Sequence, residues 1–92
     1  MDKIIVIECA SWYQREDGLI QIVNKNGKNV ILNKIETDIW NTIEYEIEEQ
    51  ELIDKLQSKY ESSQIKDILE KFYLADLASI HKKEEDLELL FG

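Results

Sequence analysis

Residues 30–40 read Val-Ile-Leu-Asn-Lys-Ile-Glu-Thr-Asp-Ile-Trp, and within this stretch the chain changes from strand-like to helix-like sequence. Asn33 has the short polar side chain that is typical of a helix N-cap, and Glu36 stands where its carboxylate can reach back to the cap amide. Apolar residues then recur at helical spacing as far as Ile43. The stretch therefore predicts a strand that ends at Leu32 and a helix that begins directly after it.

Upstream of this stretch, the sequence predicts a meander of three short strands. Two turn signals separate its β-branched and aromatic segments: Glu-Asp-Gly at residues 16–18 and Asn-Lys-Asn-Gly at residues 24–27. Asp-Gly favours a hairpin because the turn needs positive φ angles. The strands are expected at residues 11–15, 19–23 and 29–32. The β-branched run at residues 3–8 is either a fourth strand or an extension of the first.

Downstream, residues 33–90 contain neither Gly nor Pro and predict three helices. The first continues from Asn33. The second is expected at residues 49–60, with the stripe Leu52, Ile53, Leu56 and Tyr60. The third is capped by Ser62 or Ser63, with the stripe Ile65, Ile68, Leu69 and Phe72, and its apolar face is widened by Tyr73, Leu77 and Ile80. Strands followed by helices predict an α+β fold.

Length and charge narrow the range of functions. The 92 residues are enough for one small domain, with its core at about residues 11–80 and an acidic, then apolar, tail at residues 81–92. A net charge of −9 argues against a nucleic-acid partner, because such binding depends on clustered Lys and Arg. No apolar run is long enough to span a membrane. We expect a cytoplasmic protein, and the Met1 start favours a standalone chain.

A meander followed by three helices has the outline of a winged helix-turn-helix. The exposed start of the third helix, residues 63–71, carries no net charge, whereas a DNA reader needs a basic footprint there. Catalytic patterns are also lacking. Cys9 and His81 are the only residues of their kinds, so Cys9 is expected as a small buried hydrophobe and His81 as a solvated residue. The sequence predicts no enzyme, no metal site and no cofactor.

Four segments in order carry a resemblance to a known family. Residues 12–20 form an aromatic strand that ends in the Asp-Gly turn, and residues 30–40 contain Leu-Asn, a spacer and then Ile-Trp. Residues 51–60 and 65–77 fall where the family has its second and third helices. Residues 11–80 resemble in this way the PqqD-like family, also described as the RiPP recognition element. Two departures stand at residues 44–46 (Glu-Tyr-Glu) and 78–80 (Ala-Ser-Ile), where many members have a Gly.

The resemblance implies a non-enzymatic domain with a three-stranded sheet packed on three helices. Such domains bind the leader of a ribosomally made precursor peptide as an added strand and present the peptide to a modifying enzyme. The partner enzyme is expected to be a radical SAM maturase, with a leader peptidase as the second choice. The charge of −9 also favours a peptide rich in Lys or Arg.

The candidate peptide-binding residues come from two segments. The strand Asn29, Val30, Ile31 and Leu32 offers backbone pairing on a short edge, and Ile31 points outward if its two neighbours face the core. In the third helix, Ile65, Lys66, Leu69 and Tyr73 are the candidates. Leu69 and Tyr73 form either a cleft wall with Ile31 or part of an ordinary core, and Lys66 could meet an acidic group on the peptide.

Other interpretations remain open at this point. The chain could be an acidic winged-helix adaptor or regulator that binds another protein, or an N-terminal domain of a larger modifying enzyme. The apolar end of the tail, with Leu90 and Phe91, is expected to pack on the core or to dock on a partner. Trp12, Ile39 and Trp40 are assigned to the core.

Overall fold

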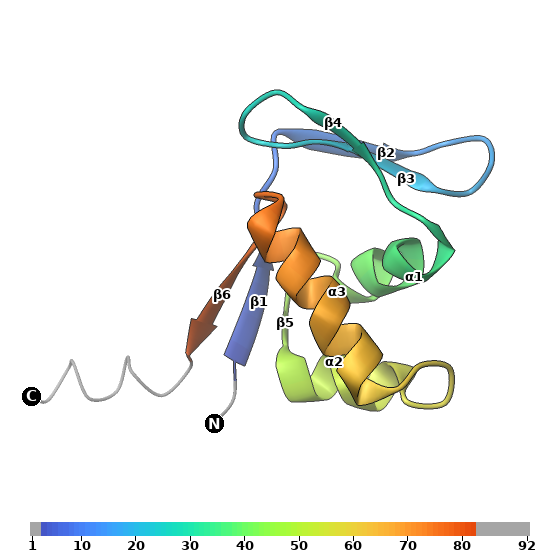
Figure 1. Ribbon diagram of the computed structural model, residues 1–92, viewed down its shortest axis with the longest axis vertical. Helices are drawn as coiled ribbons and strands as arrows, with labels where there is room; N and C mark the ends of the chain where they lie inside the picture. The colour runs from blue at the N-terminus through green and yellow to red at the C-terminus, as the bar shows by residue number, and fades with distance from the viewer. Residues whose placement is uncertain (1–2, 83–92) are drawn as a thin grey trace, which may run out of the picture.

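The computed structural model describes residues 3–82, so the expectation for Leu90 and Phe91 lies outside the described part of the chain. The fold of these described residues is α+β, with three helices and six strands in two small antiparallel sheets (Figure 1). A three-stranded meander lies at one end of the molecule. The second sheet lies beside the helices. The α+β class predicted from the sequence is confirmed.

The meander consists of β2 (Ser11–Gln14), β3 (Ile20–Val23) and β4 (Asn29–Ile31), in that spatial order. Its first turn contains Gly18 at φ 88°, a conformation that Gly adopts without steric cost. In the second turn, the side-chain carbonyl of Asn24 accepts hydrogen bonds from the backbone amides of Asn26 and Lys28. The predicted strands and both turns are therefore confirmed, with strand ends shifted by about one residue.

Helix α1 (Lys34–Ile43) begins at the predicted N-cap. The Asn33 side chain accepts from the Glu36 amide at 2.9 Å, and the Glu36 carboxylate accepts from the Asn33 amide at 2.9 Å. This reciprocal arrangement is a capping box, which satisfies two amides that would otherwise lack partners at the helix start. Because Leu32 is the last strand-like residue and Asn33 the cap, β4 leads into α1 without a loop.

The second sheet has the order β5–β1–β6 and differs most from expectation. Its central strand is β1 (Lys3–Ile7), which pairs with β5 (Glu46–Glu48) on one side and with β6 (Ala78–Lys82) on the other. The alternative of an additional strand at residues 3–8 is therefore confirmed, but this strand belongs to a separate sheet and does not extend the meander. Strands β5 and β6 were not predicted.

Helices α2 (Glu49–Leu56) and α3 (Ser62–Leu74) complete the fold. The prediction of a Ser cap for α3 is wrong, because the cap residue is Glu61 and no side chain bonds there. The third helix is also shorter than expected. Asp76 has φ 61°, which ends the helical path, so Leu77 and Ile80 lie in the turn and in β6 instead of on a helix.

One hydrophobic core lies between the helices and the two sheets. Ile5, Ile22, Ile39 and Trp40 are at most 1% exposed within it. The assignment of Ile39 and Trp40 to the core is confirmed, but the assignment of Trp12 is wrong. Trp12 remains 42% exposed because it lies on β2, at the outer edge of the meander, where its ring meets the Trp40 ring edge-on.

Candidate functional site

Strand β4 is an edge strand of the meander, because it pairs with β3 alone. The Leu32 amide donates to the Ile20 carbonyl at 2.8 Å, and the Lys28 carbonyl accepts from the Asn24 amide at 2.9 Å. In an antiparallel ladder, alternate residues direct their backbone groups toward the partner strand. Positions 28, 30 and 32 therefore face β3, and the amides and carbonyls of Asn29 and Ile31 point away from the sheet. These groups are available for pairing with an added strand.

The side chains of β4 alternate as the sequence predicted. Leu32 is 2% exposed and Val30 packs against the core, whereas Ile31 is 52% exposed. Ile31 lies opposite Gln21, which lies opposite Tyr13, so these three residues share the outer face of the meander. An apolar side chain is thus exposed at the centre of an unpaired edge.

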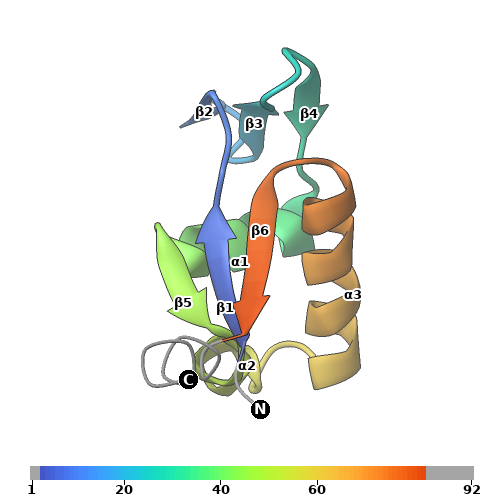
Figure 2. The same ribbon diagram turned by 90° about the vertical axis from the view of Figure 1, so that its left-hand side faces the viewer.

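Both ends of β4 are fixed to the last turn of α3. Before the strand, Asn24 Nδ2 donates to the Ala75 carbonyl at 3.1 Å, and Asn26 Nδ2 donates to Asp76 Oδ2 at 2.9 Å. After the strand, Lys71 Nζ donates to Glu36 Oε2 at 2.7 Å. Residues 71–76 therefore contact the segments that precede and follow β4, and Figure 2 shows the end of α3 below β4. The edge is held in place before any ligand binds.

This arrangement adds Leu74 to the candidate site. Leu74 is the last residue of α3 and is 72% exposed. It belongs to residues 71–76, whose contacts reach the segments on both sides of β4. Sequence analysis missed it because it stands off the buried stripe of α3. The only signal for it is an apolar residue on the polar face of a helix, directly before the helix ends.

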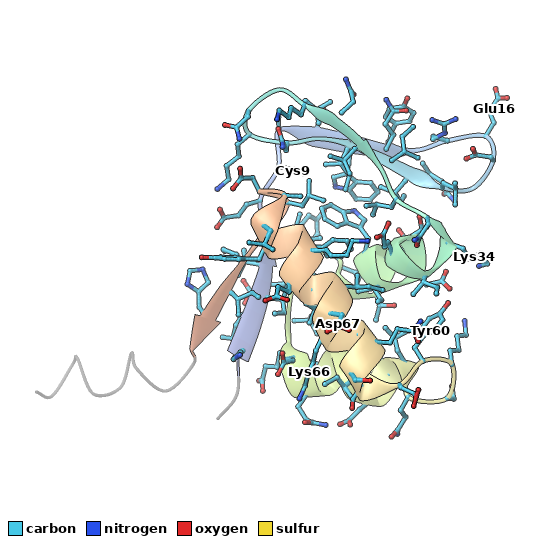
Figure 3. All side chains as sticks on the ribbon, in the orientation of Figure 1. Cys9, Glu16, Lys34, Tyr60, Lys66 and Asp67 are labelled. Carbon is cyan, nitrogen blue, oxygen red and sulfur yellow. The ribbon has the colours of Figure 1, made fainter. Side chains whose placement is uncertain are left out.

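The candidate residues of α3 lie at a different place. Lys66, Leu69 and Tyr73 line a cavity of about 350 Å³ between α3 and the second sheet. Its other lining residues are Lys3, Glu49, Asp67, Glu70 and Ile80. Figure 3 shows Lys66 and Asp67 on α3, away from β4. The structure therefore brings three of the four α3 candidates together, but it does not bring them to the β4 edge.

The burial of these residues differs. Ile65 is fully buried and Leu69 is 2% exposed, so both side chains belong to the core. Tyr73 is 52% exposed, and Lys66 is exposed as well. Of the α3 candidates, only Tyr73 and Lys66 can contact a ligand with much of their surface.

The two residues that sequence analysis considered for catalysis, Cys9 and His81, differ in their surroundings. Cys9 is half-buried, and burial raises the pKa of its thiol, which disfavours the reactive thiolate. His81 is exposed, with Nε2 at 2.9 Å from Ser79 Oγ. Within residues 3–82, no three His, Cys, Asp or Glu side chains gather in a way that could hold a metal ion. No helix in this range has the length and apolar character that crossing a membrane requires.

The Glu8 carboxylate is the most interconnected charged group near these residues. It accepts hydrogen bonds from Lys25 Nζ and from Ser79 Oγ, which lower its pKa, with the Lys25 bond as the larger cause. The bonds connect the β3–β4 turn to β6, so the role of Glu8 is to join the two sheets.

Comparisons of the chain with protein-family profiles, with curated proteins and with solved structures find no match.

Proposed function

We propose that this chain is a non-catalytic peptide chaperone of the cytoplasm. It binds the leader region of a ribosomally synthesised precursor peptide as an added strand on β4. It then presents the precursor to a modifying enzyme, a radical SAM maturase in the first instance and a leader peptidase in the second. The observation that carries the proposal is the edge of β4, where the backbone groups of Asn29 and Ile31 point away from the sheet.

The surroundings of the edge support an extended peptide as the ligand. A strand added to β4 gains backbone hydrogen bonds from two residues and directs alternate side chains to opposite faces. On the outer face its side chains would lie beside Ile31. On the inner face they would lie over the last turn of α3, where Leu74 is exposed. Because the contacts at both ends of β4 fix the edge in advance, binding requires little ordering of the protein.

The finer fold assignment belongs to the same proposal. Helices α2 and α3 would form the helix-turn-helix, and β1 with β6 would form the wing. The resemblance of residues 11–80 to the PqqD-like family supports the helix-turn-helix and the peptide ligand, whereas β1 lies outside the range of the resemblance. The net charge of −9 supports a leader with a surplus of Lys or Arg, since charge complementarity increases the association rate and the selectivity.

The experiment is a titration of the protein with the peptides encoded beside its gene, followed by backbone amide shifts. We expect saturable binding with the largest shifts at residues 29–32 and 71–76. Binding with shifts confined to other elements would contradict strand addition to β4. If none of these peptides binds, the protein is better described as an acidic adaptor for another protein.

Two variants at one position separate backbone pairing from side-chain contact. Ile31→Pro removes an amide that points away from β3, so the β3–β4 ladder keeps its hydrogen bonds while an added strand loses one. Ile31→Ala keeps the amide and removes most of the side chain. We expect the proline variant to weaken leader binding by at least about tenfold and the alanine variant to weaken it by about threefold. Leader binding that survives the proline change in a folded protein would refute the proposal.

A further inference from the structure

A second pocket lies on the other side of the meander from β4. It has a volume of about 280 Å³ and is lined by Trp12, Trp40, Asn41, Glu44 and Tyr45. These residues come from β2, from the end of α1 and from the connection between α1 and β5. Strand β2 is the opposite edge of the meander, so this pocket is separate from the edge proposed for the leader peptide.

The walls of the pocket are aromatic and are held in place. The Trp40 ring is 1% exposed and lies between Trp12 and Phe72, with T-shaped contacts at centroid distances of 6.0 and 5.6 Å. Trp12 is 42% exposed and Tyr45 is 84% exposed. The backbone of Tyr45 is fixed because its carbonyl accepts from the Ile7 amide at 2.9 Å. The aromatic side chains of Trp12 and Tyr45 are thus exposed in the same pocket as the buried ring of Trp40.

The polar groups of the pocket lack partners. Trp40 Nε1 is buried and has no hydrogen-bond acceptor among residues 3–82, which is unusual because a buried donor without a partner is unfavourable. The exposed Glu44 carboxylate has neither an ion pair nor a hydrogen bond with any described residue. Because Trp40 Nε1 is inaccessible, the accessible unpaired group is the Glu44 carboxylate, and a ligand that pairs with it carries a positive charge.

We propose that this pocket binds an arginine residue of a peptide or protein partner. A guanidinium group stacks on Trp and Tyr rings and can pair with the Glu44 carboxylate through two N–H groups. The net charge of −9 attracts a basic segment to this surface. The inference does not depend on strand addition to β4.

The chain carries its own probe for this site. It contains two tryptophans, and both line the pocket, so intrinsic tryptophan fluorescence reports on it directly. The ligand to titrate is the peptide acetyl-Gly-Arg-Gly-amide. The matched control is the same peptide with citrulline, which has nearly the same shape but no charge. We expect a saturable fluorescence change with the arginine peptide and at least about tenfold weaker binding of the citrulline peptide.

Two variants assign the effect to this pocket. Tyr45→Ala and Glu44→Gln change exposed side chains, so both proteins are expected to fold, and each should weaken binding of the arginine peptide by at least about fivefold. Tyr73→Ala removes an exposed tyrosine on α3 and should leave binding unchanged. Equal binding of both peptides, or equal loss in all three variants, would overturn the proposal. Tighter binding of tetramethylammonium than of the arginine peptide would also overturn it, in favour of a small quaternary ligand.

Discussion

Glu36 and Lys71 connect the start of α1 to the end of α3 through one carboxylate. Glu36 Oε1 accepts from the Asn33 amide at 2.9 Å, while Oε2 accepts from Lys71 Nζ at 2.7 Å. The Glu36 side chain is 10% exposed, whereas the Lys71 side chain is 65% exposed. The same contact fixes the end of β4 against α3, so stability and the shape of the proposed peptide edge depend on one residue.

The two roles of Glu36 can be separated by substitution. Glu36→Gln keeps an oxygen for the Asn33 amide but removes the ion pair with Lys71, and we expect a loss of about 1 kcal/mol in the free energy of unfolding. Glu36→Ala removes both contacts and should cost about 2 kcal/mol. Urea unfolding measures both values. Equal losses in the two variants would mean that the capping bond contributes nothing.

The two tryptophans are expected to differ in their contribution to stability. Trp40→Ala removes a fully buried ring and should lower the free energy of unfolding by about 3–5 kcal/mol. Trp12→Ala removes a ring that is 42% exposed, so the loss should be about 1–2 kcal/mol. Chemical denaturation followed by circular dichroism checks this difference. A larger loss for Trp12 than for Trp40 would contradict the core as described.

The contact between Tyr60 and Asp38 predicts a pH dependence of stability. Tyr60 OH donates to Asp38 Oδ2 at 2.5 Å, and this bond is the main cause that lowers the pKa of Asp38 and raises the pKa of Tyr60. Because the pKa of Asp38 is lowered, its carboxylate stabilises the fold at pH values above the ordinary carboxyl pKa. This contribution is lost as the pH falls through the pKa that Asp38 has in the folded protein. Because the pKa of Tyr60 is raised, its protonated phenol stabilises the fold at pH values below the ordinary phenol pKa. This contribution is lost as the pH rises through the pKa that Tyr60 has in the folded protein.

The substitution Tyr60→Phe removes the shared hydrogen bond. We expect the variant to be less stable at neutral pH and to lose less stability than the wild-type protein on both the acidic and the alkaline side. An NMR titration of the Asp38 carboxyl carbon should show its pKa moving up toward the ordinary value. Since Lys34 also lowers the pKa of Asp38, part of the shift should remain in the variant. An unchanged titration curve would show that the bond does not form in solution.

Glu44 adopts a strained backbone conformation, with φ 62° and ψ −91°. This region resembles the rare γ-turn and is costly for any residue with a Cβ atom. Glu44→Gly should therefore raise the free energy of unfolding by about 1 kcal/mol, measured by thermal and urea unfolding. Asp76 has φ 61° but accepts a hydrogen bond from Asn26, so Asp76→Gly should give a smaller gain. A loss of stability in Glu44→Gly would show that the carboxylate has a structural role.

The parts of the fold that were predicted correctly are those with local signals. The Asn33 and Glu36 pair predicted the helix start, the two Gly-containing turns predicted the meander, and strand alternation predicted the exposed Ile31. Strand β6 could not be predicted because Leu77 and Ile80 continue the helical spacing of α3. The helix ends at a positive φ on Asp76, where no Gly marks the position. Strand β5 contains a single buried residue, Ile47, which is too short a signal.

The candidate site was predictable only on the side of β4. The backbone direction of Asn29 and Ile31 follows from the hairpin register, which turn residues determine. The position of α3 relative to this strand depends on contacts between residues far apart in the sequence, such as Lys71 with Glu36 and Asn24 with Ala75. No sequence period encodes those contacts. For this reason Leu74 was missed, and it could not be foreseen that Lys66, Leu69 and Tyr73 line a cavity between α3 and the second sheet.

The central position of β1 determines the order in which the protein can mature during translation. Its two neighbours, β5 and β6, leave the ribosome after it, and β6 is the last described element. The strand pairings within the meander are local, so it can form early, whereas the sheet around β1 cannot close until residue 82 has been synthesised. Until then, the edge of β1 that pairs with β6 stays unpaired, and Ile5 lacks its partner Ile80. During this interval the nascent chain is exposed to aggregation, and a holdase that shields residues 3–7 would protect it.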